Sequence, residues 1–489
     1  MERPFPLPLL NFSALDLSAL TWAYFYSEWA IRLIMIVVVP FRRTSEAARS
    51  WLLLVMFLPW PALALYLLIG RATYPRWRRR RFERLPTVLK LSADKILELT
   101  EVAREKLPRR FTRAAILIEK LGRLPVIEGA KAEFLADYAR MVERLVADIE
   151  AAERHVHLLF YIFASDEVGQ KVMEALGRAR ERGVTCRVLI DALGSRPWER
   201  EVRTTLLDYG VEVHLILPIT FFRRKSARAD LRNHRKIAVI DGQVAYAGSQ
   251  NIIAADTLVD AGNQELMLRL EGPIVLELQA VFVADWFLET DEVLPVDSVM
   301  SSMPAAGTLT AQVLPSGPDY RVGGIESLIV TAVHSALQHV VIVTPYFVPS
   351  EPVQRAMQIA VLRGVEVHLV VPKVSDQKLV RFAQESYYTG LLAAGVKIHL
   401  FRDKFLHAKN VSIDIDLALI GSSNMDMRSF VLNSEVTVVI YDREIGLQLR
   451  RMQENYIANS DLLALDVWRR RLWIRKLAEN LARLVSPLL

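Results

Sequence analysis

The chain of 489 residues contains a single cysteine, Cys186. One cysteine excludes an intrachain disulfide, so the fold does not depend on an oxidising compartment. The sequence also lacks Cys and His clusters at metal-ligand spacing, and it has no carboxylate cluster that could replace them. We therefore predict a protein with no metal site and no cofactor.

Charged residues are scarce in two long stretches near the N-terminus. Leu20–Val39 carries only Glu28 and Arg32, which are four residues apart and can pair on one face of a helix, and Trp51–Ile69 carries no charge. A transmembrane helix needs about 20 mostly apolar residues, and membrane helices tolerate prolines such as those in the second stretch. We predict a membrane hairpin over residues 1–70, which makes the protein multi-pass.

Two alternatives to this hairpin follow from its flanking residues. A cleaved signal peptide followed by a core helix is disfavoured, because no small-residue cleavage site follows the first stretch. Seven arginines between Arg71 and Arg84 place that side in the cytoplasm by the positive-inside rule, together with the rest of the chain. The connecting loop is also basic, so a first segment that enters only one leaflet remains an alternative. Residues 71–129 are predicted to form a basic, helical juxtamembrane connector.

The remainder of the chain contains a duplication. Strands predicted at 155–164 and 183–191 return at 339–348 and 364–372, and further segments repeat at offsets of roughly 170 to 190 residues. The linker between the copies is rich in Ser, Pro, Ala and Gly. These patterns predict an α/β fold of two similar halves around a pseudo-two-fold axis. The halves are residues 130–293 and 308–460, and residues 461–489 follow as a basic amphipathic C-terminal helix.

Each half contains the motif H-x-K-x4-D-x6-G-S-x-N. Its fixed polar residues are His234, Lys236, Asp241, Ser249 and Asn251 in the first half, and His407, Lys409, Asp414, Ser422 and Asn424 in the second. Six fixed residues that recur at identical spacing indicate one shared function. The motif predicts a single active site to which both halves contribute.

The residue types in the motif suit phosphodiester chemistry. One neutral imidazole can attack phosphorus and form a phosphohistidine, while a second, protonated imidazole donates to the departing alkoxide. Lys236 and Lys409 can stabilise charge on the non-bridging oxygens, and the Ser and Asn residues can donate hydrogen bonds to them. Asp241 precedes Gly242, a pair typical of a hairpin turn, so a structural role for this aspartate is an alternative to a catalytic one.

With these motifs the chain resembles the phospholipase D superfamily, whose signature is the duplicated HKD motif, and within it the bacterial cardiolipin synthase family. The resemblance covers nearly the whole chain. Its carriers are LYLLIG (65–70), HLLFYIF (157–163), RNHRK (232–236), TPYFVPSE (344–351), NMDMRSF (424–430) and LARLVSPLL (481–489).

The resemblance implies transfer of a phosphatidyl group from one phosphatidylglycerol to another, with release of glycerol. It implies His234 as nucleophile and His407 as general acid, with Glu265 and Glu435 orienting the histidines. The Asn-to-Glu spacing differs between the halves, at 14 residues in the first and 11 in the second. It also implies a bacterial inner-membrane location, phospholipid partners including cardiolipin, and no nucleic acid; a homo-oligomer is left open.

Three competing functions remain at the level of sequence. A hydrolase of the same superfamily would use water as the acceptor. A nuclease would agree with the basic patches but gains nothing from anchoring in lipid. A non-catalytic lipid-binding scaffold would need neither His–Lys pair.

Overall fold

The computed structural model describes residues 17–43, 45–70, 76–218, 230–257, 259, 261–320 and 323–485. The chain divides into two compact units, the first ending at Thr73 and the second beginning at Tyr74. Each unit is described by itself.

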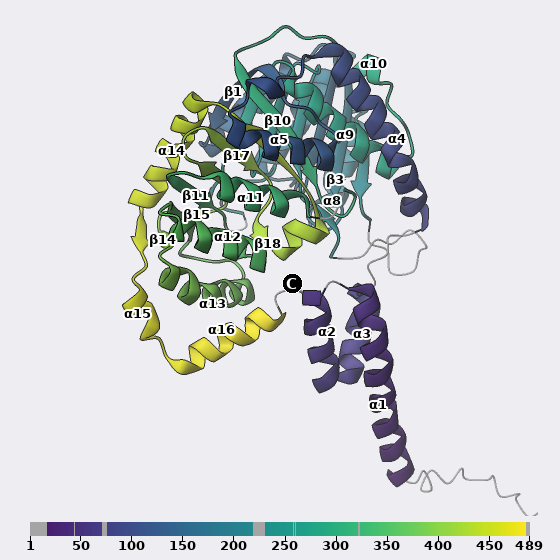
Figure 1. Ribbon diagram of the computed structural model, residues 1–489. Helices are drawn as coiled ribbons and strands as arrows, with labels where there is room; N and C mark the ends of the chain where they lie inside the picture. The colour runs from purple at the N-terminus through teal and green to yellow at the C-terminus, as the bar shows by residue number, and fades with distance from the viewer. Residues whose placement is uncertain are drawn as a thin grey trace, which may run out of the picture. The chain divides into compact units, whose positions relative to one another are not determined.

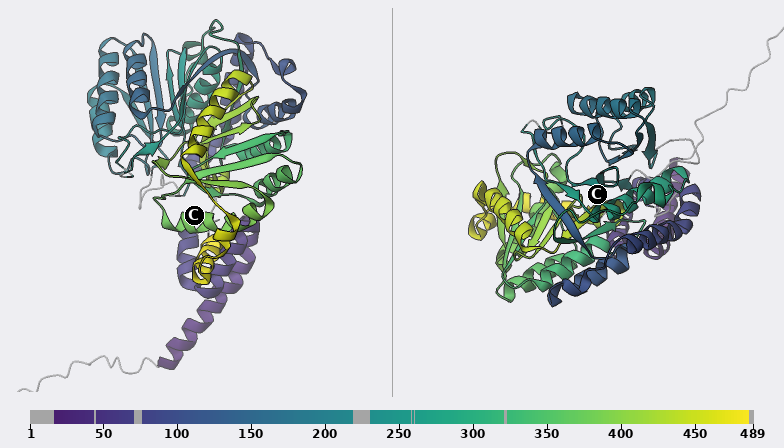
Figure 2. Two further views of the ribbon diagram at one scale, coloured as in Figure 1. Left: turned by 90° about the vertical axis from the view of Figure 1, so that its left-hand side faces the viewer. Right: turned by 90° about the horizontal axis from the view of Figure 1, so that it is seen from above.

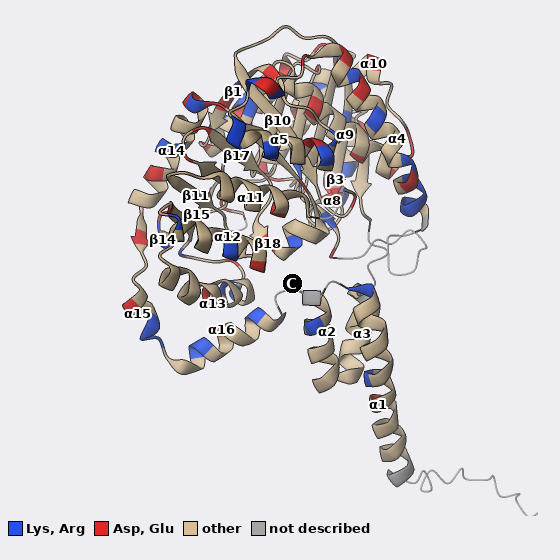
Figure 3. Ribbon diagram, viewed as in Figure 1, with Lys and Arg blue, Asp and Glu red and all other residues tan. Residues whose placement is uncertain are grey.

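The N-terminal unit consists of three helices around a small apolar core. The helices are α1 (Leu17–Arg42), α2 (Ser45–Phe57) and α3 (Pro59–Ile69). Its core contains Ile31, Met35, Val39, Ala48, Trp51, Val55, Ala62 and Tyr66. Among the described residues, Leu20–Arg42 is the one helical segment long and apolar enough to cross a membrane. The predicted pairing of Glu28 with Arg32 is present, at 3.2 Å between Oε2 and Nη2, and these are the charged residues in the middle of α1 (Figure 3).

The prediction of one kinked helix over residues 51–69 is wrong. The rings of Trp51 and Tyr66 contact each other with centroids 5.1 Å apart, whereas a straight helix would separate them by about 22 Å. The chain therefore reverses at Leu58, just before Pro59, whose ring cannot supply the backbone N–H that would continue α2. The two resulting helices have 13 and 11 residues. At about 1.5 Å per residue, neither reaches across the ~30 Å hydrocarbon core of a bilayer.

The second unit has a mixed α/β fold with two similar halves, as predicted, and the halves lie side by side (Figures 1 and 2). Strands β1 and β10 pair antiparallel and join the halves into one sheet. Outward from this pair, the first half contributes β1 (Ile127–Leu135), β9 (Met267–Glu271), β7 (Val244–Gly248), β6 (Lys236–Ile240), β2 (His155–Phe160), β3 (Thr185–Asp191) and β4 (Glu212–Ile216). The second half contributes β10 (Leu309–Ser316), β19 (Asn433–Ile440), β17 (Leu417–Gly421), β16 (Asn410–Ile413), β11 (His339–Val343), β13 (Glu366–Pro372) and β14 (Lys397–Phe401), with β20 (Ser460–Leu462) at the edge. The same order of antiparallel and parallel partners on both sides is what an internal duplication produces.

Helices cover both faces of this sheet. The outer face of the first half carries α6 (Tyr138–Glu150), α7 (Glu167–Glu181) and α8 (Glu199–Asp208). The outer face of the second half carries α5 (Arg109–Gly122), α11 (Gly324–Ser335), α12 (Glu351–Leu362) and α13 (Lys378–Ala394). The inner faces share one core with α9 (Ile274–Thr290) and α14 (Arg443–Ala458). Within β11, Val340 and Ile342 pack outward while Val341 and Val343 pack inward, the period-two alternation expected of a strand covered on both faces.

The remaining elements pack onto this unit. They are the helices α4 (Arg76–Leu99), α10 (Val296–Val299), α15 (Leu465–Arg469) and α16 (Trp473–Val485), a 3-10 turn (Arg104–Lys106), a π-helix (Arg428–Leu432), and the parallel strand pair β12 (Phe347–Val348) and β18 (Met425–Asp426). Three further short strands are β5 (Arg232–Asn233), β8 (Asn263–Gln264) and β15 (Phe405–Leu406). Helix α4 lies against α9, and its Arg78 is buried in ion pairs with Glu289 and Asp319. Part of the basic run that suggested a connector facing the membrane therefore points into the protein.

Candidate active site

Two very short parallel strand pairs carry the motif histidines across the boundary between the halves. Strand β5 (Arg232–Asn233) pairs with the start of β19, so that Asn233 lies opposite Ser434. Strand β15 (Phe405–Leu406) pairs with β8 (Asn263–Gln264), so that Leu406 lies opposite Gln264. In each pair, the next residue is a histidine on one strand and a glutamate on the other. The register thus brings His234 beside Glu435 and His407 beside Glu265.

Each histidine bonds a carboxylate from the other half. His234 Nδ1 lies 3.1 Å from Glu435 Oε1, and His407 Nδ1 lies 2.6 Å from Glu265 Oε1. An Nδ1–H that donates to a carboxylate leaves the lone pair of Nε2 available for attack on phosphorus or for accepting a proton. The arrangement therefore fixes the tautomer of both imidazoles. The carboxylate that each histidine needs comes from the other half.

Serine hydroxyls hold the two carboxylates in place. Ser249 Oγ donates to Glu265, and the equivalent Ser422 donates to Glu435. Ser429 adds a third contact to Glu435, at 3.0 Å. The motif serines were predicted to bind phosphoryl oxygens, but both are buried and occupied by glutamate. Their observed contacts orient the glutamates instead.

The electrostatics of the site follow from burial beside several charges. Burial lowers the pKa of His234 to about 4, with the positive charge of Lys236 acting in the same direction against the opposing pull of Glu435. Burial also lowers the pKa of His407, which Glu265 partly offsets. Burial opposes ionisation of Glu435 and Glu265, yet the partner histidine, the neighbouring lysine and a serine hydroxyl together favour the carboxylate, so both pKa values lie below the ordinary value.

The two lysines are buried at the base of the site. Lys236 Nζ donates to the carbonyl of His234 at 2.6 Å, and Lys409 Nζ donates to that of His407 at 2.7 Å. Burial lowers the pKa of Lys236 to about 7 and that of Lys409 to about 8, although the neighbouring glutamates favour the charged form. The positive charge of each lysine acts on both imidazoles and lowers the pKa of His234 and of His407.

Asp241 and Asp414 lie away from the histidines, at the far ends of β6 and β16. Both adopt positive φ angles, of 55° and 53°, in the turns that follow these strands. The Asp241 carboxylate accepts hydrogen bonds from the backbone amides of residues 153–155, and that of Asp414 accepts from the amides of 337–339. A catalytic role for either aspartate does not agree with this geometry. Asp241 instead anchors the loop that leads into β2, and Asp414 anchors the loop that leads into β11. The structural role in a turn that was considered for Asp241 therefore also holds for Asp414, although no glycine follows Asp414.

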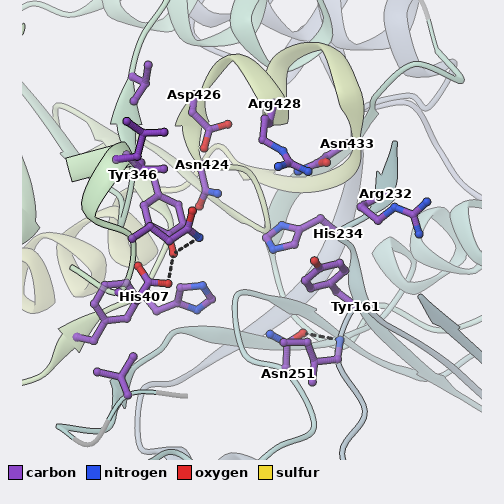
Figure 4. Close-up of a pocket in the computed structure, with 18 of the residues that line it drawn as sticks. Tyr161, Arg232, His234, Asn251, Tyr346, His407, Asn424, Asp426, Arg428 and Asn433 are labelled. Atoms are coloured by element: carbon purple, nitrogen blue, oxygen red, sulfur yellow. Dashed lines mark hydrogen bonds between the residues drawn. The ribbon is translucent and has the colours of Figure 1, made fainter. Parts of the chain in front are cut away.

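The histidines face a shared cavity of about 460 Å³ (Figure 4). The motif asparagines Asn251 and Asn424 line it as well, and Asn251 Oδ1 accepts a hydrogen bond from the Ile162 amide at 3.1 Å. The oxygen Oδ1 of Asn424 has no hydrogen-bond partner among the described residues. Asn424 is thus the motif amide best placed to bind a ligand.

The cavity wall contains polar residues that the motif did not predict. They are Tyr161, Arg232, Asn263, Tyr346, Asp376, Gln377, Asp426, Arg428 and Asn433. Arg232, Arg428 and Asn433 lie around His234, and Tyr346 and Asn424 lie towards His407 (Figure 4). Tyr346 donates to Asp376 at 2.6 Å. Asp426 and Arg428 do not recur in the first half, where Ile253 and Ala255 stand at the equivalent places. The duplicated motif therefore could not indicate them.

The remaining wall is apolar and comes mainly from the second half. It includes Val348, Leu379, Val380, Ala383, Phe405 and Met427. Apolar walls beside a cationic centre suit a phosphodiester that carries hydrocarbon chains. Among the described residues, no group of three or more His, Cys, Asp or Glu side chains is placed to hold a metal ion.

A single cavity lined by one histidine from each of two duplicated α/β halves, with a buried lysine two residues after each histidine, defines a phospholipase D-like enzyme. The family model described as "Cardiolipin synthase, PLD-like domain" matches residues 145–286 and 329–457. The chain is 35% identical over 484 residues to cardiolipin synthase A of Pectobacterium atrosepticum and also to that of Serratia proteamaculans. Each alignment covers 96% of this chain and 99% of the relative. The chain belongs to the cardiolipin synthase family.

A solved structure shares the fold. The phosphatidylserine synthase of Haemophilus influenzae Rd KW20 superimposes with a TM-score of 0.59 at 17% identity, covering 77% of this chain and all of that one. At this level of identity the likeness concerns the fold alone. It supports the assignment of the sheet and its two halves to a known architecture.

Proposed function

We propose that the chain synthesises cardiolipin by transferring a phosphatidyl group from one phosphatidylglycerol to the glycerol of a second, with release of glycerol. The observation that carries the proposal is the pair of histidines in one cavity, each bonded to a glutamate of the other half. The near full-length relatives named cardiolipin synthase A support the substrate.

The reaction balances in two steps. His234 Nε2 attacks phosphorus of the first lipid, and the phosphorus–oxygen bond to glycerol breaks while His407 gives its proton to the departing oxygen. His407 then removes a proton from the hydroxyl group of the second lipid. That oxygen attacks phosphorus, the phosphorus–nitrogen bond to His234 breaks, and cardiolipin leaves. Lys236 and Lys409 stabilise the non-bridging oxygens in both steps.

The assignment of nucleophile and acid rests on the different surroundings of the two imidazoles. His234, whose pKa is lowered to about 4, is neutral at physiological pH and is suited to attack. His407 has the shorter carboxylate contact, which favours its imidazolium form once an anionic phosphate is bound. We therefore assign His234 as nucleophile and His407 as the group that donates and then removes the proton.

Product analysis tests the function and its closest alternative. Purified full-length protein is mixed with phosphatidylglycerol vesicles without added metal, and the lipids are separated by chromatography. Cardiolipin and free glycerol in equal amounts are expected. Phosphatidic acid as the sole lipid product would replace the synthase by a hydrolase that uses water as the acceptor.

The activity is expected to fall as pH rises through the range in which the lysines lose their protons. Lys236 and Lys409, with pKa values of about 7 and 8, must be charged to stabilise the phosphate, whereas His234 is already neutral well below this range. We expect kcat/KM to decrease above about pH 7, roughly tenfold per pH unit once the first essential proton is lost, and more steeply above about pH 8, where the second is lost as well. Initial rates from pH 5 to 10 measure this, with circular dichroism at each pH as the control for folding. A kcat/KM that stays constant to pH 10 would contradict charged lysines in the free enzyme.

We also propose that α1 crosses the membrane once and that α2 and α3 form a re-entrant pair that enters and leaves on the same side. The Trp60 indole donates to Ser27 at 3.2 Å, so the turn between α2 and α3 reaches only part of the way along α1. In this arrangement the basic residues at 42–49 and those at 71–84 share one side, in agreement with the positive-inside rule. A two-crossing hairpin would place them on opposite sides.

Cysteine accessibility is expected to distinguish the two topologies. Phe41→Cys and Leu362→Cys should react with a membrane-impermeant maleimide from the same side of the membrane, and Leu20→Cys from the other. The native Cys186 is buried and serves as the unreactive background. Labelling of positions 41 and 362 from opposite sides would establish the two-crossing hairpin instead.

A further inference from the structure

Helix α16 presents an apolar stripe to solvent. Trp473, Ile474, Leu477, Leu481 and Leu484 follow the helical spacing of three and four residues, and each is between 48% and 70% exposed. The opposite face of the helix is buried through Glu479 and Ala482. Contiguous exposed apolar surface of this kind marks an interaction site.

Contacts with the rest of its unit hold α16 in this orientation. Arg475 Nη2 bonds Glu385 of α13 at 2.7 Å, and the guanidinium of Arg483 lies over the Tyr387 ring at 4.9 Å. Trp468, just before the helix, packs on Tyr388 with ring centroids 5.4 Å apart. The polar side of α16 is thus used for docking onto α13, and the apolar side is left outward. This is the reverse of what a helix folded against a soluble domain normally does.

Helix α13 connects this stripe to the active site. Leu379, Val380 and Ala383, in the first turns of α13, line the cavity that contains both histidines. Glu385, Tyr387 and Tyr388 of the same helix contact α15 or α16. Figure 1 shows α16 running along α13. Whatever covers the apolar stripe therefore lies on the α13 side of the cavity, with α16 and α13 between it and the histidines.

The composition around the stripe indicates its partner. Arg469 and Arg470 are exposed beside it, Lys476 lies on the helix itself, and the acidic Glu479 is buried in an ion pair with Arg471 (Figure 3). A helix with Trp and Leu on one side and flanking cations suits the boundary between acyl chains and anionic headgroups. An uncharged protein partner would not require cations beside an apolar stripe.

We infer that the exposed face of α16 docks on the surface of an anionic bilayer and so holds the α13 side of the catalytic cavity at the level of the lipid headgroups. The inference rests on the proposed function in one respect: the substrate enters this cavity from the bilayer. Docking would let the phosphate reach His234 and His407 while the acyl chains stay near the apolar cavity wall.

Depth-dependent quenching tests the contact directly. Leu477→Cys in the full-length chain is labelled with an environment-sensitive fluorophore and reconstituted into vesicles that contain phosphatidylglycerol with or without nitroxide-labelled acyl chains. Leu207→Cys, on α8 of the other half, is the matched control, since the two leucines are 50% and 51% exposed. We expect at least twofold stronger quenching at 477 than at 207. Equal quenching would overturn the inference. A probe already shielded in lipid-free detergent, in a manner that depends on protein concentration, would assign the stripe to a second copy.

Activity provides an independent readout. The variant carrying Leu477→Asp and Leu481→Asp is expected to lose at least tenfold in rate on vesicles and to stay within twofold of the unaltered chain on short-chain phosphatidylglycerol in micelles. Leu207→Asp should change neither rate. Equal losses on vesicles and micelles would reject docking in favour of a folding defect. If the unaltered chain forms no cardiolipin on either substrate, the proposed function fails, and the quenching experiment still decides whether α16 meets lipid.

Discussion

Replacing His234 by alanine is expected to reduce cardiolipin formation by at least about a thousandfold, because the phosphorus–nitrogen bond of the intermediate then cannot form. His407→Ala should cause a loss of similar size on phosphatidylglycerol, whose glycerol leaving group needs a proton. The two variants should behave differently on a phosphatidyl ester of p-nitrophenol. That leaving group departs without a proton, so His407→Ala should release about one equivalent of nitrophenolate in a burst and then stop.

The burst experiment also decides which histidine is the nucleophile. Mass spectrometry of the stalled His407→Ala protein should locate the phosphatidyl group on His234, and His234→Ala should give no burst. A burst from His234→Ala, with the adduct on His407, would reverse the assigned roles. Substantial cardiolipin formation by either variant would remove the shared two-histidine site. His334→Ala, a histidine on α11 outside the cavity, controls for non-specific effects of the substitution.

Glu435→Gln is expected to reduce kcat by about a hundredfold or more with little change in KM. The glutamine keeps the shape of the side chain but removes the charge that fixes the tautomer of His234 and balances the positive charge that this ring acquires in the phosphohistidine. Glu265→Gln should have a comparable effect through His407. Both glutamates are positioning residues, because they act on the substrate through a histidine.

The pH profile separates this role from a purely structural one. Without the carboxylate, the pKa of the partner histidine should fall further, so the acidic limb of kcat should move to lower pH. Glu435→Asp, which keeps the charge, should recover part of the lost rate. Glu366→Gln, in an exposed ion pair with Lys397, is the matched control and should leave both parameters unchanged. An unshifted profile in Glu435→Gln would restrict this glutamate to packing.

The sequence predicted that the two His–Lys pairs belong to one candidate site, because its two copies of the motif repeat with identical spacing. The histidines and lysines could be found from the motif, and the duplicated strand order followed from segments that recur at a constant offset. The contacts of His234 with Glu435 and of His407 with Glu265 could not be derived from spacing. Each glutamate lies in the other half, and its position depends on the register of a strand pairing only two residues long. The geometry does not agree with the predicted catalytic role of Asp241 and Asp414. A repeated motif shows which residues recur together, and duplication repeats an aspartate that anchors a turn just as it repeats a catalytic residue.

The membrane segment shows a different limit of prediction. Hydropathy measures length and polarity, and residues 51–69 satisfy both. Hydropathy contains no information on whether the helix continues straight through Leu58. That depends on the contact between Trp51 and Tyr66. The cavity wall was missed for a third reason. Asp426 and Arg428 occur in the second half only, so the internal repeat did not predict them.

The strand pairs that cross between the halves bear on when this enzyme becomes active during its own synthesis. His234 emerges from the ribosome about 200 residues before Glu435, and Glu265 precedes His407 by 142 residues. A chain that ends before residue 407 therefore holds neither complete His–Glu pair, and both pairs exist only after Glu435 has been made. Lipid cleavage by a partial product, with no acceptor site to receive the phosphatidyl group, is prevented by the order in which the residues are made.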